Sequence, residues 1–352
     1  MKYPLSDDIA HVLSEDLPWN LLAGKCIAIT GANGMLASFL TETLLHLNDR
    51  LSSPMKVVGL VRNINKARAR FSACDDNGRL VLREWNVDDV DINVPECNIL
   101  IHAASIPRPD DRHPVDVIAP NVIGTRNLLE YARCKCSAFD QFIFFSSGAV
   151  YGDGFVSEER IGEDRYFPIN QLNPVSCYAE SKRMGENICM SYMRQFGINV
   201  RMLRYFHTYG PGMDLGNDPR SFVDFINRVV KGRDIELMSD GGMKRCFCYV
   251  SDATIALFRV LFYGSSGEAY NIANDSGYMS IYELARLIAR LGGDRSRVVV
   301  NGTMHRDVHE GYAPQGHTAR PDLSKMMSLG YVPSVSPEKG FKKVLDSIMR
   351  KQ

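Results

Sequence analysis

The feature that most constrains this chain is an apolar run that passes through a glycine turn into a helical pattern. Residues 25–30 read Lys-Cys-Ile-Ala-Ile-Thr, the turn at 31–34 reads Gly-Ala-Asn-Gly, and the apolar residues of 35–48 recur at helical spacing. In a dinucleotide-binding domain, this order places backbone N–H groups and the helix N-terminus against a pyrophosphate. A glycine pattern alone usually marks an ordinary turn, but the strand and helix on either side favour a binding site.

The glycine turn supplies the first candidate binding residues. Gly31 and Gly34 allow the backbone to turn tightly and to approach a pyrophosphate closely. Asn33, Met35 and Leu36 lie in the turn and at the start of the helix, where their N–H groups would face the same phosphates. We therefore predict that these residues contact a dinucleotide.

Further apolar runs alternate with helical patterns through the first half of the chain. They cover residues 56–61, 80–87, 98–103 and 141–146, with a helical pattern at 120–133 between the last two. Parallel strands buried on both faces produce this alternation. We predict an α/β fold: a Rossmann-like, doubly wound parallel sheet with a smaller mixed α/β substrate lobe toward the C-terminus.

The predicted boundaries divide the chain into an extension, a sheet domain and a lobe. Residues 1–22 are predicted to form an N-terminal helical extension, and residues 23–198 an NAD(P)-binding Rossmann domain. Residues 199–352 would form mainly the substrate-binding lobe, with 199–206 and parts of 245–275 returning to the Rossmann domain.

Composition argues against several classes of partner. The 41 basic and 41 acidic residues cancel, which disfavours a nucleic-acid binder that works by bulk charge and a polybasic membrane anchor. The nine cysteines are scattered and lack the CxxC pairs of zinc sites, so we predict reduced thiols and no metal. The first residues lack the apolar core of a signal peptide, and no apolar run is long enough to span a bilayer. We expect a cytoplasmic protein with a small-molecule partner.

The end of the second predicted strand bears on the choice of cofactor. Sites for NAD usually place an Asp or Glu there, which accepts a hydrogen bond from the ribose 2′-hydroxyl. This chain has Arg62 and Asn63 at that place and no acid, and a guanidinium pairs well with a 2′-phosphate. We favour NADP(H). NAD(H) stays possible if Arg62 is only a solvated loop residue and Asn63 binds the ribose.

A Tyr and a Lys four residues apart are candidates for proton transfer. Tyr178 and Lys182 would share one helix face, where an ammonium stabilises a phenolate and lowers the pKa of the phenol. Ser147 follows the apolar run at 141–146 and could hold the oxygen that Tyr178 protonates. The pattern YxxxK is often a chance surface pair, but here the glycine turn, the serine and the Tyr/Lys helix occur in the order that the chemistry needs.

With these motifs the chain resembles the extended short-chain dehydrogenase/reductase family, the NAD-dependent epimerase/dehydratase group of nucleotide-sugar enzymes. The resemblance runs from about residue 24 to residue 345, and its supporting motifs are Ala103-Ala104-Ser105, Asn121-Val122-Ile123-Gly124-Thr125, Arg204-Tyr205-Phe206-His207-Thr208-Tyr209-Gly210-Pro211, Tyr249-Val250-Ser251-Asp252 and Arg320-Pro321-Asp322. It implies that Ser147, Tyr178 and Lys182 form a catalytic triad. It also implies a homodimer joined through a four-helix bundle, built here from helices at 120–133 and 176–196.

The resemblance further implies two sets of binding residues. Those on the cofactor side are Gly31, Asn33, Gly34, Met35, Leu36, Arg62, Asn63, Asn86, Val87, Ala103, Ala104, Asn121, Tyr178, Lys182 and Tyr205, of which Asn121 would be structural. Those on the side of the substrate, a nucleotide-diphosphate sugar, are Ser147, Gly148, His207, Arg220, Arg245 and Arg320. The arginines suit phosphate oxygens because a guanidinium forms forked hydrogen bonds. His207 stands where Asn is frequent, and a structural role is as favoured as contact with the substrate.

Within the family, two residues narrow the expected reaction. The 4,6-dehydratases carry Asp-Glu directly after the catalytic hydroxyl residue, and decarboxylases that resemble the family keep a Glu there. This chain has Gly148 and Ala149, which cannot transfer protons. We expect NAD(P)-dependent reduction of the C4 keto group of a nucleotide-linked 4-keto-6-deoxyhexose, as in the conversion of dTDP-4-dehydro-6-deoxyglucose to a dTDP-6-deoxyhexose such as dTDP-fucose. The product would serve surface polysaccharides such as lipopolysaccharide O-antigen.

Two other functions stay open at this point. The first alternative is a nucleotide-sugar 4-epimerase of the UDP-hexose type with tightly bound NAD, because the same three residues, Ser147, Tyr178 and Lys182, serve both reactions. A non-catalytic dinucleotide sensor is a distant third, because such a protein would be expected to lose the Tyr/Lys pair.

Overall fold

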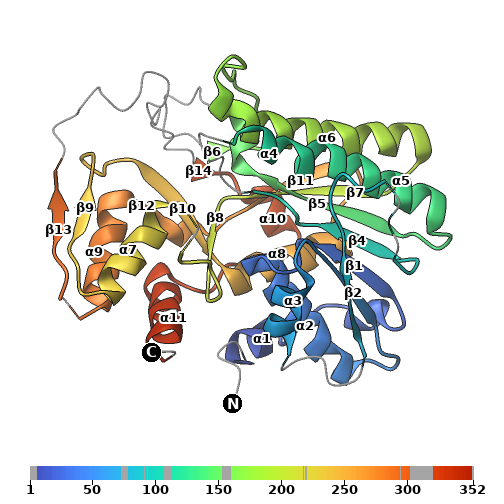
Figure 1. The fold of residues 1–352 in the computed structure, drawn as a ribbon, viewed down its shortest axis with the longest axis horizontal. Helices are drawn as coiled ribbons and strands as arrows, with labels where there is room; N and C mark the ends of the chain where they lie inside the picture. Colours follow the sequence, from blue (N-terminus) through green and yellow to red (C-terminus); the bar gives the residue numbers. More distant parts are fainter. Residues whose placement is uncertain are drawn as a thin grey trace.

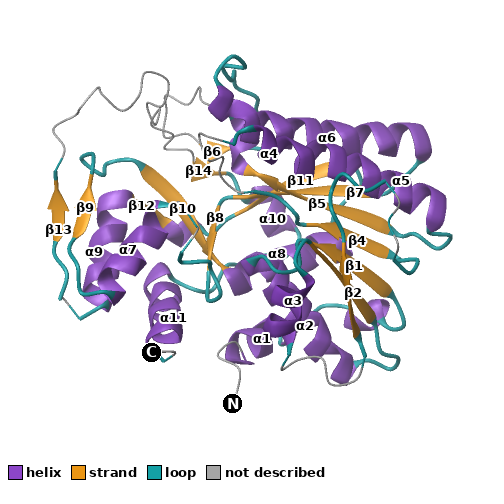
Figure 2. Ribbon diagram, in the orientation of Figure 1, coloured by secondary structure: helices purple, strands orange, loops and turns teal. Residues whose placement is uncertain are grey.

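Seven parallel strands form the main sheet, in the order β11-β7-β5-β4-β1-β2-β3 (Figures 1 and 2). The computed structural model describes residues 6–72, 78–90, 92, 94–106, 113–152, 160–216, 218, 220–293, 295–301 and 320–350. The strands of this sheet are β1 (Cys26–Thr30), β2 (Lys56–Val61), β3 (Leu80–Glu84), β4 (Ile99–His102), β5 (Gln141–Ser147), β7 (Val200–Tyr205) and β11 (Glu268–Ile272). The strand order runs outward from β1 in one direction and from β4 in the other. This confirms the predicted doubly wound sheet, and α/β proteins bind ligands where such an order reverses.

Helices cover both faces of the sheet (Figure 2). One layer contains α2 (Met35–Leu47), α3 (Ile64–Phe71) and α8 (Val250–Tyr263), and the other contains α4 (Val115–Ala119), α5 (Thr125–Lys135) and α6 (Cys177–Phe196). β5 and β7 are buried almost throughout, because the side chains on both faces of each strand meet a helix layer. One apolar cluster joins the first layer to the sheet and a second joins the other layer to it.

The helix predicted at 120–133 differs from the one observed. It starts earlier, with α4, and passes through a π-helical turn at Pro120–Gly124 before α5 begins. Pro120 has no backbone N–H, so the regular hydrogen-bond ladder is interrupted there. Single π turns of this kind often accompany functional sites.

A smaller lobe of mixed strands and helices lies beside the main sheet (Figure 1). Its three-stranded sheet has the order β12-β10-β8, with β8 (His207–Tyr209) parallel and β12 (Tyr278–Ser280) antiparallel to β10 (Lys244–Tyr249). Two strand pairs join β9 (Ile235–Leu237) to β13 (Val298–Val300) and β6 (Arg160–Ile161) to β14 (Arg320–Pro321). The helices that follow in this half of the chain are α7 (Ser221–Val230), α9 (Ile281–Leu291), α10 (Ser324–Ser328) and α11 (Pro337–Met349).

The first described helix, α1 (Ser6–Leu13), connects the two parts of the molecule. It packs against α2 and α8, and its Asp8 is buried. The carboxylate of Asp8 accepts a hydrogen bond of 2.8 Å from the Tyr249 hydroxyl and forms an ion pair with Lys343 of α11. Among the described residues, no helix combines the length and the hydrophobicity that crossing a membrane requires.

Candidate functional site

The glycine turn lies where the order of the main sheet reverses. Gly31 has a φ of +63°, and a Cβ at this position would lie 2.8 Å from the Cα of Ala104, which follows β4. Only glycine therefore fits between the ends of β1 and β4. Gly34 donates its N–H to the carbonyl of Gly31 at 2.8 Å and precedes the first residue of α2. The N-terminus of α2 and the residues Ala103 and Ala104 thus border the same spot, as the predicted dinucleotide site requires.

A chain of hydrogen bonds that sequence reasoning missed supports this turn from below. The hydroxyl oxygen of Thr30 accepts from the N–H groups of Ala103 and Ala104, at 3.1 and 3.0 Å, and lies 2.7 Å from Nδ1 of His102. Nε2 of His102 is 2.9 Å from the carbonyl of Pro120. A carbonyl only accepts, so Nε2 carries the proton and Nδ1 accepts from Thr30. Burial lowers the pKa of His102 to about 3, which keeps the ring neutral.

The predicted ribose end presents the guanidinium of Arg62. Arg62 follows β2, is exposed, and forms no hydrogen bond or ion pair with any residue that the structure describes. The side-chain oxygen of Asn63 instead caps α3 by accepting from the N–H of Lys66 at 2.8 Å. The carbonyl of Asn63 accepts from Nδ2 of Asn33 at 3.2 Å. Arg62 is therefore free to contact the ribose or its phosphate, whereas the side-chain oxygen of Asn63 already accepts a hydrogen bond.

Arg70 is a second residue that sequence reasoning missed on this side. From α3 its guanidinium donates to the carbonyl of Asn33 in the glycine turn at 2.9 Å and to the carbonyl of Gly212 at 3.3 Å. Lys66, one turn earlier, lies 3.6 Å from the carboxylate of Asp214. The glycine turn and the segment after β8 are therefore linked through α3.

The remaining cofactor-side candidates hold the surrounding backbone. The N–H of Asn86 donates to the carboxylate of Asp89 at 3.0 Å, and the carbonyl of Val87 accepts from Asn127 at 3.1 Å. Asn121, inside the π turn, donates to Ser181 Oγ at 2.9 Å, consistent with the structural role expected for it. The hydroxyl of Tyr205, at the end of β7, is buried and finds no partner among the described residues.

The three candidate catalytic residues meet at the end of β5. Tyr178 and Lys182 lie on α6, and Ser147 is the last residue of β5. Burial raises the pKa of the Tyr178 phenol, which outweighs the opposing effects of a hydrogen bond with Ser147 and of the Arg220 charge. Ser147 Oγ accepts from the N–H of Ala149 at 3.2 Å, so its own proton is free to point toward Tyr178.

Lys182 lies on α6 four residues after Tyr178, and its ammonium has a backbone partner of its own. Its ammonium donates to the carbonyl of Phe145 at 2.6 Å and lies 4.9 Å from the ring centre of Phe144, and the cation that acts on the Tyr178 phenol is Arg220. Burial lowers the pKa of Lys182 to about 7, against the opposing charge of Glu186. Lys182 is thus a buried ammonium close to its neutral form at physiological pH.

Two predicted substrate residues lie beside this group. A Cβ on Gly148 would come within 2.7 Å of the ring of Phe206, so no side chain fits there without movement of the ring. Nδ1 of His207 is buried and unpartnered among the described residues. Burial lowers the pKa of His207 to about 3, helped by the charges of Arg245 and Arg220, so the imidazole is neutral.

The predicted phosphate-binding arginines are not equally available. Arg220 is held by the carboxylate of Asp218 and donates to the carbonyl of Thr208 at 2.9 Å. Arg320 forms a two-point ion pair with Asp275, with both contacts at 2.8 Å. Arg245 donates to the carbonyl of Lys244 at 3.0 Å and has a further partner. Arg220 therefore already has its charge balanced by an aspartate, whereas Arg320 shares the single carboxylate of Asp275 with Arg160.

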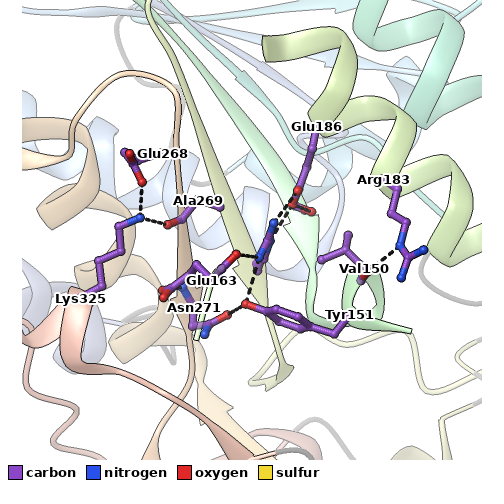
Figure 3. Close-up of polar contacts among 11 residues, drawn as sticks. Val150, Tyr151, Glu163, Arg183, Glu186, Glu268, Ala269, Asn271 and Lys325 are labelled. Atoms are coloured by element: carbon purple, nitrogen blue, oxygen red, sulfur yellow. Dashed lines mark hydrogen bonds and ion pairs between the residues drawn. The ribbon is translucent and has the colours of Figure 1, made fainter. Parts of the chain in front are cut away.

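A buried polar network behind Ser147 was also missed. Arg204 of β7 pairs with Glu186 of α6 at 2.8 Å and donates to the hydroxyl of Tyr151 at 3.0 Å and to the carbonyl of Glu163 at 2.9 Å. The hydroxyl of Tyr151 in turn donates to Asn271 Oδ1 at 2.6 Å, and Figure 3 shows these side chains converging from separate segments. In the same view, Arg183 reaches from α6 to the carbonyl of Val150, and Lys325 reaches Glu268 and Ala269 (Figure 3). Within the described part of the chain, no group of His, Cys, Asp or Glu side chains is arranged to hold a metal.

Comparison with known proteins gives a consistent family. A model of the NAD dependent epimerase/dehydratase family matches residues 27–273. UDP-glucuronic acid decarboxylase 1 of Xenopus tropicalis is 31% identical over 327 residues, which are 91% of this chain and 71% of that protein. A putative UDP-glucose 4-epimerase of Methanocaldococcus jannaschii is 30% identical over 327 residues, 91% of this chain and 97% of that protein.

Solved structures share the fold over nearly the whole chain. A UDP-glucuronic acid 4-epimerase from Bacillus cereus, in complex with UDP-glucuronic acid and NAD, has a TM-score of 0.76 at 24% identity and covers 93% of this chain and 100% of its own. A UDP-glucose 4-epimerase from Thermotoga maritima, with UDP-glucose, has a TM-score of 0.77 at 21% identity. The match covers 93% of this chain and 99% of that one.

Proposed function

The chain belongs to the NAD dependent epimerase/dehydratase family, and on that premise we propose that it is an oxidoreductase acting at C4 of a nucleotide-diphosphate hexose. The preferred reaction is reduction of a 4-keto-6-deoxyhexose, with dTDP-4-dehydro-6-deoxyglucose as the first substrate to test. The meeting of Ser147, Tyr178 and Lys182 at the end of β5 supports chemistry of this type.

The residues at the reversal of the sheet fit a dinucleotide. Gly31 lets the end of β1 lie against the backbone of Ala104, where no Cβ fits, and the Oδ1 atom of Asn33 is buried without a partner among the described residues. The N–H groups of Met35 and Leu36, at the start of α2, suit a pyrophosphate. A reduced nicotinamide bound there supplies the hydride for C4.

The protein's own residues supply the proton and hold the oxygen. Because burial raises its pKa, Tyr178 is a protonated phenol at neutral pH and can give that proton to the C4 oxygen. The Ser147 hydroxyl, directed toward Tyr178, would hold the same oxygen. Lys182 fixes the end of β5 through the carbonyl of Phe145 and places a positive charge beneath the site while it is protonated.

The observation that most supports a reductase, and the use of NADP(H) in particular, is the unpaired guanidinium of Arg62. It stands where an NAD site usually has an acid, and it has no competing partner among the described residues. The UDP-glucuronic acid 4-epimerase from Bacillus cereus is in complex with NAD, so the preference for NADP(H) belongs to this proposal alone. An exchangeable NADPH suits a reductase, which consumes one cofactor per turnover.

Positions 148 and 149 offer no acid for decarboxylation or dehydration. Several relatives are UDP-glucuronic acid decarboxylases, yet Gly148 and Ala149 stand where the resembling enzymes carry acids. Phe206 also excludes a longer side chain at position 148. The site thus supports hydride and proton transfer at C4 without a further acid or base.

The second candidate is a 4-epimerase that retains NAD. One observation favours it: Arg70 links the glycine turn to Gly212, an arrangement suited to a dinucleotide that stays bound between turnovers.

Exposed apolar side chains on the α4–α6 face (Ile118, Ile123 and Met184) support the homodimer through a four-helix bundle. Because Ser147, Tyr178 and Lys182 are all present, the sensor function is the least supported. A cytoplasmic location and a role in surface polysaccharides remain part of the proposal.

The proposal is tested by offering the purified protein dTDP-, UDP-, GDP- and CDP-linked 4-keto-6-deoxy sugars with NADPH or NADH. We expect loss of reduced cofactor in equal amount to the sugar reduced, faster with NADPH. Interconversion of UDP-glucose and UDP-galactose without added cofactor would replace reduction by epimerisation. Release of CO₂ from UDP-glucuronic acid would show that the chain shares the relatives' decarboxylation and would refute the reductase.

A further inference from the structure

Three side chains spaced four residues apart on α6 meet three consecutive residues at the end of β5. The pairs are Tyr178 with the Ser147 hydroxyl, Lys182 with the Phe145 carbonyl at 2.6 Å, and Glu186 with the Ser146 hydroxyl at 2.5 Å. Positions four apart share one helix face, so the three contacts form one row between helix and strand. The first two belong to the proposed catalytic machinery. The third, Glu186, has no role there.

Glu186 is held more firmly than its neighbours in the row. Arg204 donates to both of its oxygens, from Nε at 2.9 Å and from Nη2 at 2.8 Å, and Ser146 donates to the first. The two side chains of this ion pair are only 5% and 13% exposed. Charge-assisted hydrogen bonds to both oxygens fix the carboxylate in place.

The same ion pair connects the row to the substrate side. Arg204 also binds the hydroxyl of Tyr151, in the turn that begins with Gly148, and the carbonyl of Glu163, next to β6. Asn271 joins these segments, since its Nδ2 donates to the carbonyls of Ile161 and Asp322, at 2.9 and 3.1 Å. Figure 3 shows Glu186, Tyr151, Asn271 and Glu163 around one centre. Movement of Glu186 would therefore disturb both the catalytic row and the turn beside it.

We propose that Glu186 is a positioning residue of the Tyr178–Lys182 pair: its fixed carboxylate supplies the negative charge that faces Lys182 from one helical turn away, and it holds the strand end that carries Ser147. The catalytic use of Lys182 rests on the proposed function. The contact of Glu186 with the Ser146 hydroxyl does not depend on it.

Few charges face Lys182, so the contribution of Glu186 is large. The titratable groups around it are Glu186 and Cys189 on α6 and the neutral His102 on β4, and its aromatic neighbour is Phe144 on β5. Arg204, the cation behind Glu186, is paired with that carboxylate. Burial lowers the pKa of Lys182 to about 7, and Glu186 is the first charge that opposes this effect. Without that carboxylate, Lys182 would lose its proton at a lower pH.

The test is a direct titration of Lys182 in the full-length protein. Lysine labelled with ¹³C at Cε is followed by NMR against pH, and the Lys182→Met variant identifies the signal. Wild type is expected to titrate near pH 7. Glu186→Gln should lower the midpoint by about one unit or more, the size of shift typical of a nearby opposite charge. An unchanged midpoint in folded Glu186→Gln overturns the proposal.

Two further variants separate this role from a general loss of charge or packing. Glu180→Gln removes the same charge from the other side of the same helix and should leave the midpoint within about 0.3 unit, because side chains two positions apart do not face each other. An equal shift there overturns the proposal. Glu186→Asp keeps the charge and should restore most of the wild-type midpoint.

Removing Glu186 alone leaves Arg204 buried and unpaired, which can prevent folding. In that case Glu186→Gln combined with Arg204→Met carries the test, with the same expected downward shift and the same overturning result. The titration also separates the two proposals. A shifted midpoint in a protein that reduces no sugar of the panel supports the role of Glu186 and counts against the reductase.

Discussion

Phe206 occupies the space into which any side chain at position 148 would project, since a Cβ on Gly148 would lie 2.7 Å from its Cε1 atom. The ring cannot withdraw freely, because it packs against Tyr151 with ring centres 6.3 Å apart. We predict that Gly148→Ala costs about 1–3 kcal/mol of unfolding free energy and most of the turnover. Urea unfolding and steady-state kinetics measure both. Gly216→Ala, where a Cβ would have only ordinary contact at 3.7 Å, should be nearly neutral.

Tyr178→Phe is predicted to reduce turnover by about 100-fold or more while NADPH binding changes little. The substitution removes only the acidic hydroxyl, and general acid catalysis commonly contributes that much. Cofactor binding is followed by NADPH fluorescence and turnover by loss of absorbance at the nicotinamide band. Full activity in the variant would remove Tyr178 from its assigned role.

Arg62→Ala is predicted to weaken NADPH binding by about tenfold or more and NADH binding by less than about twofold, because only NADPH carries the phosphate that a guanidinium would bind. Isothermal titration with both cofactors gives the comparison. Lys66→Ala is the control, since this nearby cation already faces Asp214 at 3.6 Å and should weaken both cofactors slightly and equally. Equal losses in Arg62→Ala would refute the 2′-phosphate assignment.

Thr30→Val is predicted to destabilise the protein by about 1–3 kcal/mol, because it leaves the half-buried N–H groups of Ala103 and Ala104 without an acceptor. Thr43→Val is the matched control. The Thr43 hydroxyl donates only to the carbonyl of Phe39 within its own helix, at 2.8 Å, so its loss should cost little. Urea unfolding measures the free energy of unfolding of both variants. A similar decrease in the two variants would contradict the prediction.

Lys182→Met is predicted to change how stability depends on pH. In the folded protein the pKa of Lys182 is about 7, below its ordinary value of 10.5, so the unfolded chain binds more protons between these values. Stability of the wild type must therefore rise with pH relative to the variant. The unfolding free energy of wild type minus variant should increase by about 2 kcal/mol from pH 7 to pH 9. A constant difference over this range would show that Lys182 titrates normally.

Most features that the sequence predicts correctly are marked by patterns of neighbouring residues. The run at 25–30, the glycine turn and the following helix were read from adjacent residues, and these define β1, the turn and α2. Tyr178 and Lys182 needed only the spacing of a helix. Such signals survive in a single sequence because each depends on neighbours along the chain.

The unpredicted features depend on partners far apart along the chain. The sequence suggests Arg320 as a phosphate-binding residue, but it does not show that Asp275, 45 residues earlier in sequence, pairs with it. The contact between Thr30 and His102 spans 72 residues, and no local pattern marks either partner. Lys182 could be assigned to its helix face, but its bond to the Phe145 carbonyl required the packing of α6 on β5. These are products of tertiary packing, which spacing along one helix or strand does not encode.

The position of Asp8 has a consequence for the order in which the chain can mature during synthesis. Its carboxylate is buried between Tyr249 and Lys343. Because both partners come much later in the sequence, α1 is synthesised long before either of them. α1 can pack on α2 as soon as both have been made, but its buried carboxylate gains its last partner only after α11 has been translated. Burial of the Asp8 charge is therefore among the late events in the folding of this chain.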